Sequence, residues 1–265
     1  AVGVALAACG SKGSGGSGPA GGGTVTVVTH DSFSVPDELI DAFRADTGYA
    51  LELVASGKSG ELTNKLVLTK DAPLGDAFIG VDNTFASRIL DEGVIDASAA
   101  VDLPEGADRY VIDDTPALTP IDFGEVCINI DTAWFAEHDV TPPAAFEDLT
   151  GADYKDLFVA INPSTSSTGL AFLLATVGHF GTGEAGGFAD YWKRLAANGM
   201  RIDEGWSDAY YTDFSGGGEG GAHPIVVSYS SSPAATLTEN GSASTTAALL
   251  STATRQVEDA GGLAG

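Results

Sequence analysis

Residues 24–55 read TVTVVTHDSFSVPDELIDAFRADTGYALELVA and predict a strand, a helix and a second strand in succession. The β-branched run at 24–29 is typical of a buried strand. Apolar residues then recur three and four positions apart, with Pro36 suited to the first turn of a helix and Gly48 to its left-handed cap. Residues 49–55 alternate in polarity as a strand does. Such a unit implies parallel strands in one sheet.

The rest of the chain continues the alternation of strands and helices, which indicates the α/β class. Its end is rich in Ser, Thr and Ala, and 247–259 are expected to form one weak helix with no strand after it, so we predict a truncated C-terminal part. Further strands are expected at 77–81, 126–130, 158–161 and 225–229, and further helices around 62–66, 84–90, 170–180 and 188–195.

A length of 265 residues suits one large domain or two lobes. The series of strands and helices begins anew near residue 120, which places a boundary close to 117–122. We predict four parts: a signal-peptide remnant, lipobox and tether at 1–23, an α/β lobe one at 24–117, an α/β lobe two at 118–226, and a crossover with an incomplete return to lobe one at 227–265.

The N-terminal stretch is small and apolar and contains a cysteine. Residues 6–10, LAACG, resemble the bacterial lipobox, whose cysteine becomes a lipid-modified first residue. A Gly- and Ser-rich tether follows at 10–23, in the order expected of a surface-anchored protein. We therefore expect lipidation at Cys9, an extracytoplasmic location and membrane contact through that lipid alone. Without a lipid, the same stretch would be a disordered terminus.

The composition narrows the classes of partner. Acidic side chains number 37 and basic ones 12, which gives a formal net charge of −25. Nucleic-acid binding and docking on anionic lipids both need a basic face, so neither is expected, whereas cationic ligands would be attracted. Two cysteines and four scattered histidines show no metal-ligand spacing, and no GxSxG motif is present.

Ligands of open α/β sheets bind at the carboxyl ends of the strands. A hydroxyl-rich loop at 162–169 lies at such an end and runs into a predicted helix, where it is equally compatible with ordinary capping by Ser167 or Thr168 and with an anion site. Trp206, beside a glycine, suits either the core or a stacking platform. The other strand ends carry His30, Asp31, Ser32, Asp82, Asn83, Tyr229 and Ser230.

Six segments between about residues 24 and 235 together resemble the thiamine-binding, extracytoplasmic solute-binding proteins of ABC importers. The resemblance implies a periplasmic-binding-protein-like fold: two α/β lobes with mixed sheets, hinge crossover strands and a ligand in the cleft. The segments are THDSF at 29–33, GVDN at 80–83, PIDFG at 120–124, NPSTSSTGL at 162–170, GWSDAY at 205–210 and SYSSSPA at 228–234.

The same resemblance implies particular roles. Trp206 and Tyr229 enclose the thiamine rings, and Ser166 and Ser167 contact the phosphate of a phosphorylated thiamine. Lys58 departs from the pattern, because members of the family often carry an acidic residue there, and Ala235 replaces an aromatic of some relatives. The full set of expected ligand-binding residues is His30, Asp31, Ser32, Asp82, Asn83, Asp122, Ser166, Ser167, Trp206, Tyr210, Tyr229 and Ser230.

We therefore expect a monomeric binding protein that delivers thiamine, or a thiamine phosphate, to an ABC permease by lobe closure, without cofactor, metal or catalysis. Three alternatives stay open. Adjacent Tyr210 and Tyr211 suit a ferric-ion binder of the same fold, because phenolates are hard ligands. Asp31 or Asp82 could serve a phosphatase-type hydrolase. A surface adhesion or scaffold domain is the third.

Overall fold

The structure is a computed structural model that describes residues 22–99, 101–112, 117–238 and 240–264. Cys9 and nearly all of the predicted tether lie outside the described residues. Within the described ranges, eight strands form one mixed sheet in the order β2-β1-β3-β8-β4-β7-β5-β6. The strands are β1 (Thr24–Thr29), β2 (Ala50–Ala55), β3 (Ala77–Asp82), β4 (Thr119–Asp131), β5 (Phe158–Ile161), β6 (Arg201–Asp203), β7 (Ile225–Tyr229) and β8 (Thr246–Gly262).

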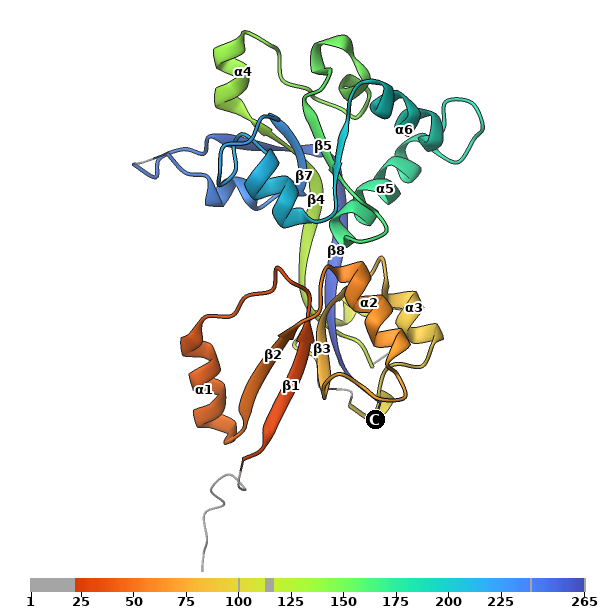
Figure 1. Ribbon diagram of the computed structural model, residues 1–265, viewed down its shortest axis with the longest axis vertical. Coiled ribbons are helices and arrows are strands. Elements are labelled where there is room, and N and C mark those ends of the chain that lie inside the picture. Colours follow the sequence, from red (N-terminus) through yellow and green to blue (C-terminus); the bar gives the residue numbers. More distant parts are fainter. Residues whose placement is uncertain (1–21, 100, 113–116, 239, 265) are drawn as a thin grey trace, which may run out of the picture.

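Helices cover this sheet in two separate groups (Figure 1). One group lies beside β1, β2 and β3, and the other beside β4, β5 and β7. The α-helices are α1 (Asp37–Thr47), α2 (Ser59–Leu68), α3 (Ala86–Asp91), α4 (Thr132–His138), α5 (Ser167–Phe180) and α6 (Phe188–Ala197). A π-helical turn at Asp208–Asp213 and short 3₁₀ turns at Ala97–Ala99, Asp108–Tyr110, Glu147–Thr150, Ala152–Tyr154 and Ser232–Ala235 complete the elements.

Lobe one is built on the strand–helix–strand unit that the sequence predicts. β1 pairs in parallel with β2 and β3. Gly48 ends α1 with φ 78°, the left-handed conformation that a residue without Cβ adopts at little cost. Apolar side chains of β1, β3, α2 and α3, with Phe78 and Leu62 fully buried among them, form the core of this lobe.

Lobe two has its own core on a different part of the sheet. β5 runs parallel to β7 and to β6, and β7 runs antiparallel to β4. Phe158, Phe172 and Tyr191 are fully buried between this part of the sheet and helices α5 and α6. The two cores share no residue, which is the physical basis for two lobes rather than one.

Two long antiparallel strands, β4 and β8, run from one lobe into the other (Figure 1). The expected helix at 247–259 is therefore wrong: these residues belong to β8. Alanines would allow a helix, but β8 pairs with β4 along most of its length and with β3 at its end, and this pairing overrides the weak local preference. The predicted α/β fold of two lobes joined by crossover strands is confirmed.

Candidate ligand-binding site

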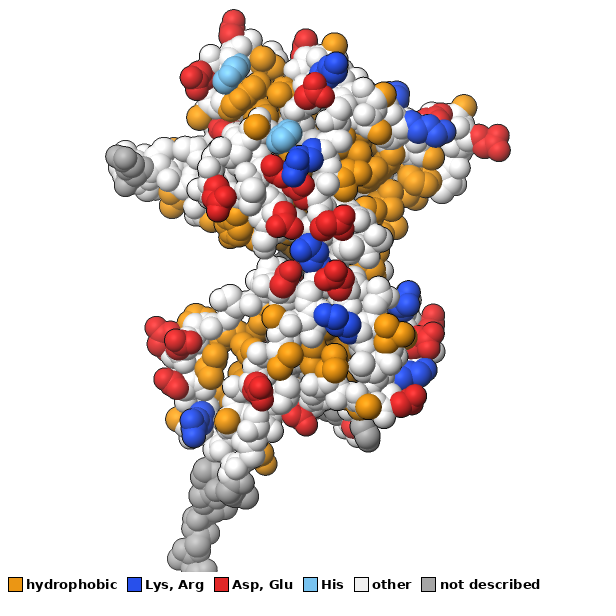
Figure 2. Space-filling view, viewed as in Figure 1, with side chains coloured by type: hydrophobic (Ala, Val, Ile, Leu, Met, Phe, Trp, Pro, Cys, Tyr) orange, Lys and Arg blue, Asp and Glu red, His pale blue; other side chains and the backbone are white. Residues whose placement is uncertain are grey.

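A cavity of about 490 Å³ lies between the lobes and is lined by both of them. Figure 2 shows a narrow waist at this level, with acidic and basic side chains gathered across it. Lobe one contributes the loop after β1 and the start of α2, lobe two contributes the start of α5 and the loop before the π-helical turn, and β4, β7 and β8 contribute the floor. The cavity is thus placed where the carboxyl ends of β1 and β5 meet the hinge.

The predicted site residues divide into two groups. His30, Asp31, Ser32, Asp122, Ser166, Ser167, Trp206 and Tyr229 line the cavity.

The other four, Asp82, Asn83, Tyr210 and Ser230, do not line it, because each is engaged elsewhere. Asn83 accepts from Val257 N at 2.8 Å and so ties β3 to β8. Ser230 N donates to Glu125 O at 2.8 Å, and Tyr210 is buried behind Trp206. Asp82 is buried and accepts from Thr84 Oγ1 at 2.6 Å.

Aromatic rings form one wall of the cavity. The Trp206 and Tyr210 rings stack with centroids 5.0 Å apart and planes 14° apart, so Tyr210 supports the ring that faces the ligand space. Trp206 Nε1 donates to Ser228 Oγ at 2.9 Å, which fixes the indole. The Tyr229 hydroxyl lies 3.1 Å from Thr168 Oγ1, and burial raises its pKa, so this phenol stays protonated at neutral pH.

Hydroxyl groups at the start of α5 form a second wall. Of the two alternatives for this loop, capping by Ser167 or Thr168 is not found: Ser166 is the N-cap residue, and its side chain makes no capping hydrogen bond. Ser167 Oγ instead lies 3.1 Å from Ser59 Oγ on lobe one and accepts from Gln256 Nε2 at 3.1 Å. The first turn of α5 therefore presents hydroxyls and backbone N–H groups toward the cavity.

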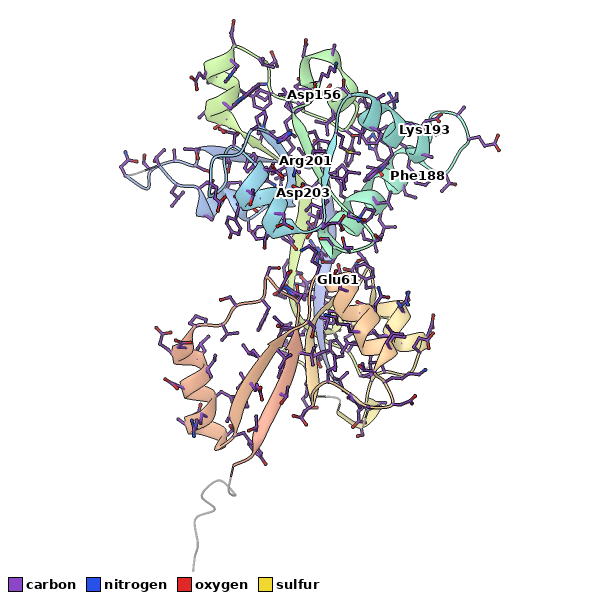
Figure 3. All side chains as sticks on the ribbon, viewed as in Figure 1. Glu61, Asp156, Phe188, Lys193, Arg201 and Asp203 are labelled. Carbon is purple, nitrogen blue, oxygen red and sulfur yellow. The ribbon has the colours of Figure 1, made fainter. Side chains whose placement is uncertain are left out.

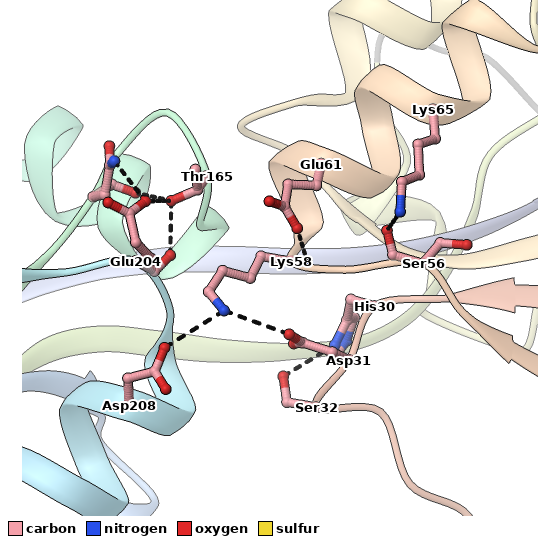
Figure 4. A network of polar contacts seen from close by, with 11 residues as sticks. His30, Asp31, Ser32, Ser56, Lys58, Glu61, Lys65, Thr165, Glu204 and Asp208 are labelled. Carbon is pink, nitrogen blue, oxygen red and sulfur yellow. Dashed lines mark hydrogen bonds and ion pairs between the residues drawn. The ribbon is translucent and has the colours of Figure 1, made fainter.

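A lysine bridges the two lobes at the cavity mouth (Figure 4). Lys58 Nζ lies 3.6 Å from Asp31 Oδ2 on its own lobe and 3.5 Å from Asp208 Oδ2 on the opposite one. Partial burial opposes the charge of Lys58, but the two carboxylates outweigh it and raise the lysine pKa. Gly60 N also donates to Thr165 O at 2.9 Å, so the lobes touch directly.

The floor of the cavity carries carboxylates. Glu258 Oε1 lies 3.0 Å from His30 Nε2, and Asp122 is the cross-strand neighbour of Glu258 on β4. Burial, and then the charge of Glu258, raise the pKa of Asp122. Sequence reasoning missed Glu258 and Gln256, because it placed them in a helix. Residues 254–258 read TRQVE and do not alternate in polarity, so no local signal marks them as a strand.

The described residues give little support to a ferric-ion site. Neither Tyr210 nor Tyr211 lines the cavity, and Tyr210 donates to Ser232 O at 3.4 Å. Across the described ranges, no group of three His, Cys, Asp or Glu side chains is placed to hold a metal ion. None of the helices in the described part of the chain has the length and apolar character needed to cross a membrane.

Comparison with known proteins gives consistent results. The profile of a family described as bacterial extracellular solute-binding protein matches residues 72–248. Thiamine-binding periplasmic proteins of Salmonella typhimurium and Escherichia coli are 29% identical over 222 residues and 28% identical over 218 residues. Each match covers 79% of this chain and 61% of the relative, so the chain spans about three-fifths of the length of these relatives.

Solved structures agree on the fold. A periplasmic thiamin binding protein superposes with a TM-score of 0.72 at 26% identity, over 91% of this chain and 73% of that one. The periplasmic binding protein AfuA of Actinobacillus pleuropneumoniae, with bound fructose-6-phosphate, gives 0.71 at 14% identity, over 92% and 74%. Because the family profile covers more than half of the sequence, the chain belongs to the bacterial extracellular solute-binding protein family.

Proposed function

We propose that this protein captures thiamine or a thiamine phosphate outside the cytoplasm and delivers it to the permease of an ABC importer. The observation that carries the proposal is the cavity between the lobes, in which an aromatic wall, Trp206 and Tyr229, faces a space that also contains the carboxylates Asp122 and Glu258. The two relatives described above are thiamine-binding periplasmic proteins, which supports the same ligand.

The chemistry of thiamine suits this cavity. Its thiazolium is a permanent cation on a flat ring, and a volume near 490 Å³ falls within the usual range for small-molecule sites. A desolvated cation over an aromatic face gains about 2 kcal/mol. The hydroxyls of Ser166 and Ser167, with the N-terminus of α5, suit a phosphate on the same ligand.

Lobe closure is the mechanism that we propose for capture. Lys58 with Asp208, and Gly60 with Thr165, are contacts that exist only when the lobes approach. A ligand that touches both lobes favours this arrangement by its differential affinity for it. The protein then acts as a monomer, without chemistry on the ligand, and Cys9 carries the lipid that holds it at the membrane.

Calorimetry with thiamine and thiamine monophosphate tests the proposal. We expect saturable binding, and we expect Trp206→Ala to weaken it by about 2 kcal/mol, roughly 30-fold, because the stacked face is lost. Trp134→Phe is the matched control, since Trp134 stacks on His138 in lobe two and lies outside the cavity. Absence of binding to either ligand, or equal affinities of the wild type and Trp206→Ala, would refute the proposal.

Two alternative functions have less support. A ferric-ion site built on Tyr210 and Tyr211 lacks access to the cavity. A hydrolase that uses Asp31 or Asp82 has little support, because Asp31 pairs with Lys58 at the mouth and Asp82 is buried beside Thr84.

A further inference from the structure

We propose that Glu258 and Asp122 bind the positive charge of an organic cation and that this binding expels a proton from the buried carboxyls Asp82 and Asp259. The inference rests on the proposed function, because it assigns the cationic part of that ligand to the floor of the cavity. It adds a pH dependence of capture, built into the strands that join the lobes.

Strand register brings the four carboxyls together. Glu258 on β8 is the cross-strand partner of Asp82 on β3 and of Asp122 on β4. Asp259, the next residue of β8, pairs with Val81 on one side and Pro120 on the other. Glu258 and Asp122 line the cavity, while the other two carboxyls do not. The floor therefore has an accessible layer of carboxylates and a buried layer close behind it.

The buried layer has too few hydrogen-bond donors: Asp82 Oδ1 accepts from Thr84 and Phe85, but the other three carboxyl oxygens of the layer have no donor. Asp82 is 1% exposed and Asp259 is 0% exposed. Asp82 Oδ2 and both carboxyl oxygens of Asp259 have no partner in the described structure. Burial without a hydrogen-bond donor disfavours the ionised form of a carboxyl, so the group tends to keep its proton. Burial raises the pKa of Asp82 to about 6 and that of Asp259 to about 7.

The surrounding charges do not relieve this cost. Within the described ion pairs, no Lys or Arg contacts any of the four carboxyls. Arg255 on β8 pairs with Glu125, and Lys58 pairs with Asp31 and Asp208. The titratable groups that face the floor from β1 and β7 are His30, which contacts Glu258, and Tyr229, whose phenol stays protonated.

A cation in the cavity supplies the missing positive charge. It attracts the ionised forms of Glu258 and Asp122 directly, and it favours ionisation of the buried pair through the same electrostatic field. The O–H bond of the buried carboxyl breaks, and its proton passes to the buffer. Because no three of the described acidic groups are placed to hold a metal, an organic cation suits this floor better than a metal ion does.

The test is calorimetry of thiamine in buffers that differ in ionisation enthalpy. We expect a net release approaching one proton per thiamine at about pH 6–7 and little release above about pH 8.5, with an affinity that falls by up to about tenfold per pH unit on acidification. Asp259→Asn removes the buried carboxyl with the higher pKa, so the proton release should fall clearly. Asp82→Asn is the second variant. It removes the other buried carboxyl, so the proton release should fall in this variant too.

Asp203→Asn is the matched control. Asp203 is a buried carboxyl of lobe two beside Arg201, with a pKa raised to about 6 by burial, and it does not line the cavity (Figure 3). It titrates in the same range, so its variant should retain the proton release on binding. Equal release by the wild type and Asp259→Asn, or loss of release in the Asp203→Asn control, would overturn the coupling.

Thermal melting against pH without ligand distinguishes a failure of this inference from a failure of the proposed function. The wild type should lose thermal stability between about pH 4 and pH 7, and Asp259→Asn should lose clearly less. Identical pH profiles would overturn the buried proton itself. If thiamine produces no heat while the pH profiles differ, the proposed ligand and its coupling are refuted and the buried proton stands.

Discussion

Gly60→Ala provides a direct test of lobe closure. Gly60 is the second residue of α2, and its N–H donates to Thr165 O on lobe two at 2.9 Å. A Cβ at this position would lie 2.6 Å from Ser164 O and 3.0 Å from Thr165 O, both of them backbone atoms of the opposite lobe, and 3.1 Å from the Phe85 ring of its own lobe. The substitution therefore acts on the contact between the lobes and leaves the backbone conformation of α2 acceptable.

The substitution should affect the stability of the free protein and its affinity for thiamine differently. Alanine in place of glycine in a helix stabilises it by up to about 1 kcal/mol, so the melting temperature of the free protein should not fall. Overpacking costs about 1–3 kcal/mol. The part due to the two backbone oxygens falls on the closed form, because they belong to the opposite lobe, whereas the contact with the Phe85 ring is present in both forms. Thiamine affinity should therefore fall roughly 5- to 150-fold.

Calorimetry, thermal melting and small-angle scattering together decide the outcome. The scattering of the variant with saturating ligand should give a larger radius than that of the wild type, because the lobes stay further apart. Gly178→Ala is the matched control: it lies in α5, and an added Cβ there meets nothing within 4 Å. Undiminished affinity and normal compaction of Gly60→Ala would show that closure does not bring α2 against the loop before α5.

Two further predictions concern charge. The folded pKa values of Asp259 and Asp82, about 7 and about 6, lie above the usual carboxyl range, so their contribution to stability is complete below about pH 4 and is lost as the pH rises through 6 and 7. At about pH 8 the free energy of unfolding of Asp259→Asn, measured by denaturant titration, should therefore exceed that of the wild type by about 2–4 kcal/mol. A less stable variant at that pH would contradict this. Asp208→Asn removes the part of the Lys58 bridge that joins the lobes, so thiamine should dissociate about two- to fivefold faster in stopped flow. At about 1 M salt the wild-type rate should rise to that of the variant, whereas the rate of the variant should stay unchanged. A salt-independent wild-type rate would contradict this.

Local sequence determined much of lobe one and the identity of many cavity residues. The run of β-branched residues at 24–29, the helical spacing after it and Gly48 each act within a few residues, and the structure has β1, α1 and the left-handed cap at these places. His30, Asp31 and Ser32 follow from the same information, because the residue after a strand of a parallel sheet lies at the ligand-binding edge.

The tertiary structure decided which polar residues face the cavity and which are buried. Residues 246–262 have little intrinsic preference, and only pairing with β4 and β3 makes them a strand. That pairing brings Glu258 into the cavity, leaves Asp259 behind it and buries Asp82, although the sequence around Asp82 resembles a binding segment. Contacts such as Lys58 with Asp208 likewise join residues far apart in the chain. Short-range preferences determine single elements, but a carboxyl acquires its neighbours and its pKa from the register of strands that meet only after folding.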